Sequence, residues 1–394
     1  MGDDATLSGA GVDPSAEPGA DPTAEPTELQ RSSRDRSQLR EQLETWLGST
    51  LGADAGAAIT SLNATSANGM SSDTILFDAT WTDAEGRRDE RLVARIAPAG
   101  EDVPVFPSYD LTQQYDAIRQ VAELTDVPVP TTFWNEPSDA AIGAPFFVMG
   151  RIDGEVPPDV MPYNFGDSWV YDATPEQQQT LQRSSIDVLA RLHAIEDPEA
   201  CFPFLALDDP GDTALRRRVA HTRAWYEFAI AGGPRSSLIE RAFAWLDDHW
   251  PAEEGPTVLS WGDSRIGNMM YRDFEPVAVL DWEMACLAPR ELDIAWMVYA
   301  HRVFEDIAHT MELPGMPDFL RPDDASTIYE SLTGHAPRHL EWYTAYSAVQ
   351  YAIVFARTGR RSVHFGEREM PDDIDEMIMN REPLEQMLAG TYWS

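Results

Sequence analysis

The chain contains no lysine, because all 29 of its basic residues are arginine. Any side chain that places a positive charge on a phosphate group must therefore carry a guanidinium, which stays protonated at physiological pH and matches phosphate oxygens with its planar fork. A GC-rich genome or adaptation to salt would give the same composition, and that alternative stays open. The consequence for a phosphate site holds in either case.

Cysteine is scarce as well, with Cys201 and Cys286 as the two examples. Two cysteines are too few for a disulfide framework, and their spacing is not that of metal ligands. No segment is apolar enough to span a bilayer, and the first residues lack the basic and apolar regions of a secretory signal. These absences lead us to expect a cytoplasmic protein in a reducing compartment.

Positive charge is heavily outnumbered, since 67 acidic residues face 29 basic ones and give a formal net charge of -38. Such a surface repels nucleic acid and anionic membranes, so we expect neither as a partner. The hydrophobic fraction of 43% is sufficient for a core, and 394 residues exceed one average domain. We expect two lobes with a small-molecule site in the cleft between them. The oligomeric state stays open.

Three regions follow one another along the chain. Residues 1–35 are acidic and rich in Pro, Ala and Gly, which is typical of a disordered tail. Residues 36–150 begin at Arg36 with leucines four residues apart and continue with two β-rich runs separated by the predicted loop AEGRR. A helical pattern over 111–124, which Pro128 and Pro130 stop, and a third apolar strand follow. Residues 151–394 are mainly long helical patterns, in which His193 is expected to be a core or capping residue. This order predicts an α+β protein with a small β-rich lobe before a large helical lobe.

One stretch of the helical region, LSWGDSRIGNMMYRDFEPVAVLDWE at 259–283, combines a polar loop with two β-rich runs. If DFEP forms a hairpin loop, antiparallel pairing sets Met270 opposite Val279 and, further along, Asn268 opposite Asp281. Directly opposed residues have Cβ atoms roughly 5 Å apart. An amide oxygen and a carboxylate at that spacing form half of a site for a hard divalent cation such as Mg²⁺.

Asp263 lies five residues before Asn268, in a glycine-containing loop. It is close enough to face the same volume without being needed as a metal ligand, so we expect it to accept and orient a hydroxyl proton. One such carboxylate beside an Asn/Asp metal site is what phosphoryl transfer from a nucleotide requires. An ordinary hairpin with solvated polar ends is the alternative, but the eighteen-residue step from Asp263 to Asp281 and the upstream β-rich lobe favour the site.

The stretch WGDSRIGNMMYRDFEPVAVLDWE, followed by PRELDIAW, resembles the aminoglycoside phosphotransferase-like family of small-molecule kinases, which includes the choline kinase type. The resemblance covers roughly residues 36–390. It implies a bilobal protein-kinase-like fold whose first lobe binds the nucleotide, with ATP or GTP as phosphoryl donor and Mg²⁺ as cofactor. It also implies Asp263 as the catalytic base and Asn268 and Asp281 as the magnesium ligands.

The resemblance implies further site residues outside this stretch. Asp293 matches the aspartate that ties down the catalytic loop, and Arg265 is expected to support the same loop. Arg95 occupies the strand position where kinases commonly place a phosphate-binding lysine. The other expected nucleotide-binding residues are Ser71 and Ser72 in the phosphate loop, Gln114 in the following helix, and Phe147 and Met149 beside the hinge.

Four features depart from the family pattern. Trp261 stands where the family usually has His, which would remove a polar anchor of the catalytic loop. Gln114 replaces a Glu, so its expected bond to the phosphate-binding arginine would be neutral. Ser71 and Ser72 replace Ser-Asn, and Gly150 replaces a hinge Glu. A catalytically weak nucleotide-binding pseudokinase is therefore an alternative function.

The acceptor substrate is the least defined part of the prediction. The residues that we expect to line a substrate pocket are Trp261, Trp282, Glu283, Trp296 and Tyr299. A largely aromatic lining favours a hydroxyl group on a moderately apolar skeleton, because burying the ammonium groups of an aminosugar against indoles is costly. An antibiotic kinase acting on aminoglycosides is the alternative substrate prediction, and core packing is the alternative role of these aromatic residues.

Overall fold

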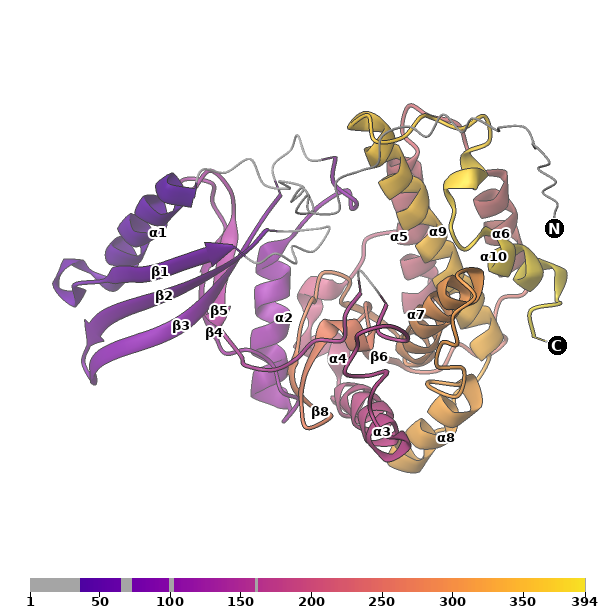
Figure 1. The fold of residues 1–394 in the computed structure, drawn as a ribbon, viewed down its shortest axis with the longest axis horizontal. Coiled ribbons are helices and arrows are strands. Elements are labelled where there is room, and N and C mark those ends of the chain that lie inside the picture. The colour runs from indigo at the N-terminus through magenta and orange to yellow at the C-terminus, as the bar shows by residue number, and fades with distance from the viewer. Residues whose placement is uncertain (1–35, 65–72, 99–102, 160–161, 394) are drawn as a thin grey trace, which may run out of the picture.

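The computed structural model describes four ranges of the chain: 36–64, 73–98, 103–159 and 162–393. The predicted acidic tail at 1–35 and the predicted phosphate-loop residues Ser71 and Ser72 lie outside these ranges. A β-sheet with two helices forms one side of the molecule, and the remaining helices form the other (Figure 1). This arrangement confirms the predicted α+β class.

The first helix, α1 (Arg36–Leu51), covers the sheet with its leucine face. Leu39, Leu43 and Leu47 recur every four residues, and all three are buried in a cluster with the apolar side chains of the strands. This is the amphipathic spacing expected of a helix that packs on one side. The helix predicted from the leucine pattern is therefore present at the predicted residues.

The sheet has five antiparallel strands in the order β1-β2-β3-β5-β4. Their bounds are β1 (Ala58–Ala64), β2 (Asp73–Asp83), β3 (Gly86–Ile96), β4 (Thr132–Glu136) and β5 (Phe146–Gly150). The predicted loop AEGRR is wrong, because only Ala84 and Glu85 lie in the turn and β3 begins at Gly86. Strands β1 and β4 are two that the sequence pattern did not indicate.

Helix α2 (Leu111–Leu124) lies between β3 and β4 in the chain and has the residues predicted for it. Asp110 caps its first turn by accepting a hydrogen bond from Gln113 N at 2.8 Å, which satisfies one of the free N–H groups there. Pro128 and Pro130 follow its end, where proline cannot continue a helix.

Eight α-helices follow β5 in the described chain, and two apolar clusters bury their inner faces. They are α3 (Pro175–Leu192), α4 (Pro198–Cys201), α5 (Ala214–Ala229), α6 (Ser237–Asp248), α7 (Glu291–Thr310), α8 (Pro322–Thr333), α9 (Leu340–His364) and α10 (Arg381–Ala389). In the described part of the chain, no helix combines the length and apolar character needed to cross a membrane.

Two short antiparallel pairs carry the stretch singled out in the sequence. Strand β6 (Thr257–Ser260) pairs with β9 (Cys286–Pro289), and β7 (Met269–Arg272) pairs with β8 (Glu275–Val279). The prediction that Met270 lies opposite Val279 is wrong by one residue, because Met269 holds that place.

The register differs because the hairpin loop is shorter than predicted. Asp273 and Phe274 alone form the turn, both with positive φ (52° and 65°), as in the two-residue turns that match strand twist. The pairing then shifts between Met270 and Tyr271. A tight turn and a bulge thus replace the four-residue loop.

The segment after β5 links the sheet to the helical region. Arg151 N donates to Arg91 O at 2.8 Å, and Glu155 exchanges two backbone hydrogen bonds with Tyr271 at 2.8 and 2.9 Å. Strand β5 ends at Gly150, and the division into two lobes at residue 150 stays a prediction. The site described below lies between β3, which carries Arg95, and the loops that flank β7 and β8.

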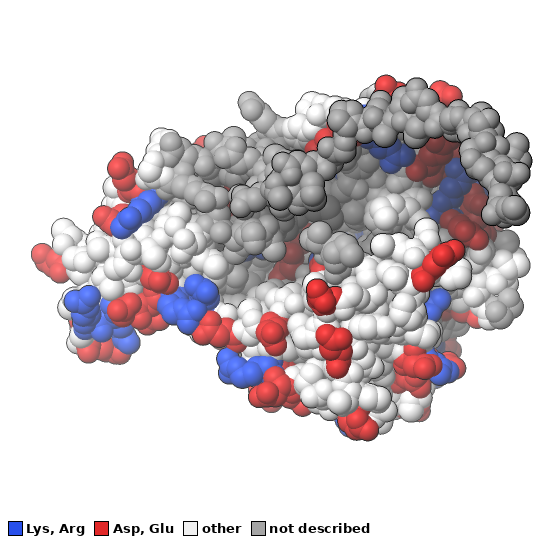
Figure 2. All heavy atoms as spheres, viewed as in Figure 1, with Lys and Arg blue, Asp and Glu red and all other residues white. Residues whose placement is uncertain are grey.

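Acidic side chains outnumber basic ones over the surface in view in Figure 2. They are scattered over that face, with arginines among them. The excess negative charge is therefore spread over that face and does not mark one binding patch there.

Candidate active site

Asp263 lies in the loop between β6 and β7, and a glycine fixes where that loop runs. Gly262 has φ of +87°, and a Cβ atom there would lie 2.1 Å from the backbone oxygen of Met284. No other residue fits such an approach without moving the backbone. The glycine therefore brings Asp263 against the segment that follows Asp281.

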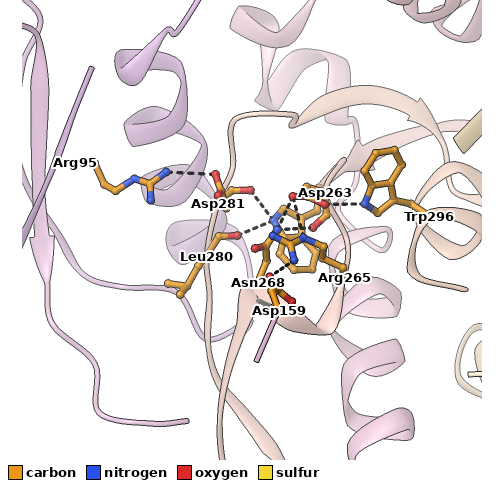
Figure 3. Close-up of polar contacts among 9 residues, drawn as sticks. Arg95, Asp159, Asp263, Arg265, Asn268, Leu280, Asp281 and Trp296 are labelled. Atoms are coloured by element: carbon orange, nitrogen blue, oxygen red, sulfur yellow. Dashed lines mark hydrogen bonds and ion pairs between the residues drawn. The ribbon is translucent and has the colours of Figure 1, made fainter. Parts of the chain in front are cut away.

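Three donors hold the Asp263 carboxylate (Figure 3). Trp296 Nε1 donates to Oδ1 at 2.7 Å, and Asn268 Nδ2 donates to Oδ2 at 2.7 Å. Arg265 Nε adds a longer contact to Oδ2 at 3.3 Å. The side chain keeps 14% exposure, so the carboxylate is both fixed in orientation and open to a ligand.

Asn268 ends a short 3₁₀ helix, Ile266–Asn268, directly before β7. Its Nδ2 group donates to Asp263 O at 3.1 Å as well as to the carboxylate, so the amide oxygen Oδ1 points away from Asp263. Its backbone oxygen accepts from Leu280 N at 2.8 Å. Because of the register shift, Asn268 pairs with Leu280 and therefore lies one residue from the predicted opposition with Asp281.

Asp281 follows β8 and adopts the left-handed φ of 56°, which is unusual for a residue with a side chain. Such strain is found mostly where a fixed orientation matters for function. Arg95 Nη2, from β3, lies 3.4 Å from Asp281 Oδ1 (Figure 3). Burial raises the pKa of the Asp281 carboxyl, the Arg95 charge opposes that rise, and the Asp263 charge adds to it.

Arg95 does not have the partner predicted for it. It donates to Thr74 Oγ1 at 3.2 Å and contacts Asp281, and no hydrogen bond joins it to Gln114 in the part of the chain that the structure describes. Gln114 is buried and lines a cavity beside α2. The expected neutral Arg95–Gln114 bond is therefore corrected to a contact between Arg95 and Asp281.

Phe147 and Met149, the residues predicted beside the hinge, lie on β5 and are 1% and 9% exposed. Phe147 pairs with Arg95 across the sheet, and Met149 pairs with Val93. Both side chains belong to the apolar cluster that extends into the helical region. Their burial leaves little side-chain surface for a ligand, so their role in nucleotide binding stays a prediction.

Asp293, in the first turn of α7, accepts four hydrogen bonds and is fully buried. Two come from the backbone N–H groups of Trp261 and Gly262, both at 2.8 Å. The others come from Ser260 Oγ at 2.8 Å and from His193 Nε2 at 3.0 Å. A carboxylate with so many donors fixes the start of the Asp263 loop to α7.

The indole of Trp261 anchors the Asp263 loop. The presence of Trp in place of the usual His was expected to remove this anchor. Its indole Nε1 donates to Leu280 O at 2.9 Å and to Asp281 O at 3.2 Å. The expectation of a lost anchor is therefore wrong, because the indole N–H ties the Asp263 loop to the segment that carries Asp281.

Arg265 contacts two carboxylates, those of Asp263 and Asp159. Burial alone would lower the pKa of the Arg265 guanidinium, but the charges of Asp263 and Asp159 raise it well above its usual value. Gly267 leaves the room for this pair, since a Cβ there would lie 2.6 Å from Asp159 Oδ1.

Most of the predicted substrate-pocket residues belong to the core. Trp261, Trp282 and Tyr299 are at most 1% exposed, and this burial corrects their assignment to a pocket. Trp296 is 3% exposed and donates its indole N–H to Asp263, while Glu283 lines the cavity beside α2. Aromatic residues at helical spacing are more often core than pocket, because a helical lobe needs aromatic packing.

Sequence reasoning missed Asp159, whereas His193 is the buried capping residue that was expected, at the end of α3. Tyr351, on α9, packs against Trp296 in a tilted arrangement with ring centroids 4.9 Å apart, and burial together with the Asp263 charge raises the pKa of its hydroxyl. His193 also bonds Tyr329 through Nδ1 at 2.9 Å. Asp159 lies far from Asp263 in the chain and in no motif, so the sequence carried no local signal for it.

The site offers oxygen ligands of the kind that Mg²⁺ prefers. No group of three or more His, Cys, Asp or Glu side chains is gathered for a metal within the described ranges. Asn268 Oδ1 and the Asp281 carboxylate are one neutral and one charged oxygen ligand, which suits a cation that takes its other ligands from water and phosphate. The Asp281 carboxylate has a long contact to Arg95 at 3.4 Å and a backbone hydrogen bond from Glu283, and desolvation still disfavours its charge, so a further cation there would be stabilised. The residues present therefore fit the predicted magnesium ion.

Solved structures with the same fold are phosphotransferases by name. A Ralstonia eutropha protein assigned to the aminoglycoside phosphotransferases is 20% identical and has a TM-score of 0.62, with 90% of this chain and 98% of that one covered. The ADP-bound aminoglycoside phosphotransferase APH(2'')-Ib is 12% identical, with a TM-score of 0.53 and coverage of 88% and 98%. The predicted protein-kinase-like fold is thereby confirmed.

Curated relatives carry other names and are much longer. The Arabidopsis thaliana protein named probable acyl-CoA dehydrogenase IBR3 is 25% identical over 310 residues, which are 73% of this chain and 35% of that protein. Acyl-CoA dehydrogenase family member 10 of Mus musculus is 25% identical over 54% of this chain and 18% of its own length. This chain thus spans about a third or less of these relatives.

The family model described as the phosphotransferase enzyme family matches residues 67–314, well over half of the chain. The matched range includes β2, β3 and the whole 259–283 stretch, so it covers both sides of the site. The chain belongs to the phosphotransferase enzyme family.

Proposed function

We propose that this protein is an ATP- and magnesium-dependent phosphotransferase that acts on a hydroxyl group of a small molecule. The observation that carries the proposal is the meeting of Arg95, Asp263, Asn268 and Asp281 at one place (Figure 3). GTP is an alternative donor, because similar proteins were solved with ADP and with GDP.

Asp263 is the proposed proton acceptor, because it is the carboxylate of the site that is not needed for the metal. Its three donors fix both oxygens, so that the carboxylate can accept a hydrogen bond from the acceptor hydroxyl and turn the oxygen lone pair toward phosphorus. The hydroxyl oxygen then forms a bond to the γ-phosphorus, the bond from that phosphorus to the bridging oxygen breaks, and ADP keeps the electron pair. The hydroxyl proton passes to Asp263.

Two sets of residues receive the charge of the phosphates. Asn268 and Asp281 would hold Mg²⁺, which neutralises phosphate charge when it is bound. Arg95 brings a guanidinium from β3, and its contacts to Thr74 and Asp281, at 3.2 and 3.4 Å, are long for charged groups. It can therefore turn to a phosphate oxygen at little cost.

The acceptor is proposed to be a hydroxyl compound of moderately apolar character. Trp296 and Tyr351 are the aromatic pair beside Asp263. The longer relatives are named for acyl-CoA chemistry, which is consistent with an acyl-like skeleton. Aminoglycosides are the rival acceptors, because similar proteins were solved with kanamycin and with hygromycin B. The hydrogen bond that Trp261 donates to Leu280 O weighs against the pseudokinase alternative, because that alternative was based in part on the loss of this anchor.

The proposal is tested by Asp263→Asn in the full chain. We expect Mg-ATP binding close to that of the parent protein, and ADP formation with an acceptor lower by a factor on the order of hundreds. Asp187→Asn is the matched control, because Asp187 lies on the exposed side of α3 in an ion pair with Arg191. Turnover by Asp263→Asn equal to that of the control would contradict the role of Asp263.

The acceptor class is tested by ADP formation across aminoglycosides, hydroxyacyl thioesters and cyclic alcohols. We expect turnover with the acyl-like or cyclic alcohols. Turnover of kanamycin-like compounds alone would overturn the acceptor proposal and would leave the phosphotransferase assignment intact.

A further inference from the structure

A cavity of about 140 Å³ lies between α2, α5 and the segment after Asp281. Its walls include Gln114 of α2, Arg218 of α5 and the Glu283–Cys286 segment. That segment begins two residues after Asp281, so the cavity adjoins the proposed phosphotransfer site. Asp263, Asn268 and Asp281 are not among its walls.

Arg218 is the unusual residue of this cavity. It is only 8% exposed, and its Nε atom is buried without a hydrogen-bond acceptor. In the described part of the chain, no Asp or Glu oxygen lies within ion-pair distance of its guanidinium. Burial disfavours the charge of the Arg218 guanidinium, but the groups around it keep its pKa above the usual value. Its buried Nε–H still lacks an acceptor, so an anion in the cavity would meet a charged donor.

The groups nearest to Arg218 do not supply that anion. Cys286 faces its charge, and the Tyr346 hydroxyl is hydrogen-bonded to its side chain. Burial raises the pKa of both the Cys286 thiol and the Tyr346 hydroxyl, the latter to about 12. Both groups are therefore neutral near pH 7. The Asp293 charge acts on Arg218 from a greater distance, but its carboxylate is already saturated by four donors.

The other charged groups of the cavity decide which anion fits. His221 is bonded to Asp209 through Nδ1 at 3.0 Å, and Asp110 caps α2. Asp110 and Glu283 put negative charge in the walls beside one guanidinium. A doubly charged phosphate would be repelled by these carboxylates, whereas a singly charged, planar carboxylate matches one guanidinium fork.

The size and the remaining lining fit a small organic acid. A cavity of roughly 150 Å³ holds a benzene-sized molecule. Phe106 stacks on Trp225, with centroids 4.9 Å apart, and both rings line the cavity. The cavity thus combines an apolar wall with a buried guanidinium that has no carboxylate partner among the residues the structure describes.

We propose that this cavity is a subsite for a carboxylate group, that Arg218 binds it, and that the acceptor of the phosphotransferase is therefore a small hydroxy acid. The assignment of the carboxylate to the acceptor rests on the proposed function, whereas carboxylate binding at Arg218 does not. The carboxylate is not changed in the reaction, so the product would be a phosphorylated hydroxy acid that keeps it.

Carboxylate binding is tested by thermal unfolding of the full chain without nucleotide. Acetate, propionate and 3-hydroxybutyrate are the probes, with chloride and inorganic phosphate at the same ionic strength as comparisons. We expect each carboxylate to raise Tm with increasing concentration, beyond the effect of chloride or phosphate. Arg218→Met should abolish this shift, and Arg223→Met, on the same helix but paired with Asp247 at the surface, should retain it.

If Arg218→Met does not fold, Arg218→Lys tests carboxylate binding at Arg218 instead. Lysine keeps the charge but loses the fork, so we expect the concentration of carboxylate needed for the same shift to rise at least tenfold. An equal shift with phosphate or chloride, or a carboxylate shift that survives in the Arg218 variants, would overturn the subsite.

The acceptor assignment is tested by ADP formation from Mg-ATP with 3-hydroxybutyrate and with its amide. We expect kcat/KM at least tenfold higher for the acid, and loss of this preference in Arg218→Met. Equal turnover of acid and amide overturns the assignment. A parent protein that fails to bind Mg-ATP contradicts the proposed function, while an Arg218-dependent carboxylate shift would still stand.

Discussion

Replacement of Asp293 by Asn tests how the Asp263 loop is held. The carboxylate is fully buried and accepts from Ser260 Oγ and Gly262 N through Oδ1, and from Trp261 N and His193 Nε2 through Oδ2. An amide in the same pose keeps its oxygen toward the first pair. Its NH₂ group then faces Trp261 N and His193 Nε2, which are themselves donors.

The expected cost follows from these lost hydrogen bonds. Each bond to a charged acceptor contributes about 1.5–3 kcal/mol, so two of them give roughly 3–6 kcal/mol. His193 can change tautomer, accept from the new amide through Nε2 and donate to the Tyr329 hydroxyl through Nδ1, which favours the lower end. A loss of roughly 3 kcal/mol is a large part of the stability of a typical domain, which is about 5–15 kcal/mol.

Denaturant unfolding followed by circular dichroism measures this loss, with turnover measured in parallel. Asp187→Asn, which breaks an exposed ion pair with Arg191, is the control and should cost about 0.3–0.5 kcal/mol. A change in unfolding free energy below about 1 kcal/mol for Asp293→Asn, with unchanged turnover, would refute the view that this carboxylate holds the loop.

Two further predictions concern the site and the pH dependence of stability. Trp296→Phe removes the 2.7 Å bond to Asp263 Oδ1, a loss of about 1.5 kcal/mol in the transition state, so steady-state assays should show kcat about tenfold lower with the KM for ATP unchanged. Burial lowers the pKa of His301 to about 4, against the opposing charge of Glu305. The unfolded chain, with a pKa near 6.5, then binds more protons between those values, so the unfolding free energy should fall by roughly 2 kcal/mol from pH 7 to pH 5. Unfolding curves at the two pH values check this, and His301→Gln should lose that part of the dependence.

Local patterns predicted the helices better than the hairpin. Helices α1 and α2 have the predicted residues, because leucine spacing and proline stops act within a few turns of chain. The β7–β8 register was wrong by one residue, because Asp273 and Phe274 both adopt positive φ without a glycine to signal the turn. The bulge after Met270 then moves every later pair, which no alternation of apolar residues reveals.

The environment of Asp263 depends on contacts that are distant in the chain. Trp296 lies 33 residues from Asp263, and the partners His193 and Asp293 lie 100 residues apart. Aromatic residues near a catalytic motif are equally compatible with core and pocket, and burial decided that Trp261 and Trp282 belong to the core. The polar motif could be predicted because its members are close in sequence, whereas the groups that orient it are brought together only by the fold.

The measurement that tests the central claim most directly is calorimetric titration of ATP into the parent protein and into Asp281→Ala, each with and without Mg²⁺. The claim is that Asn268 and Asp281 hold the metal of a nucleotide site completed by Arg95. It predicts that Mg²⁺ strengthens ATP binding to the parent and has no such effect in Asp281→Ala. Equal Mg-ATP affinity of the two proteins would contradict it.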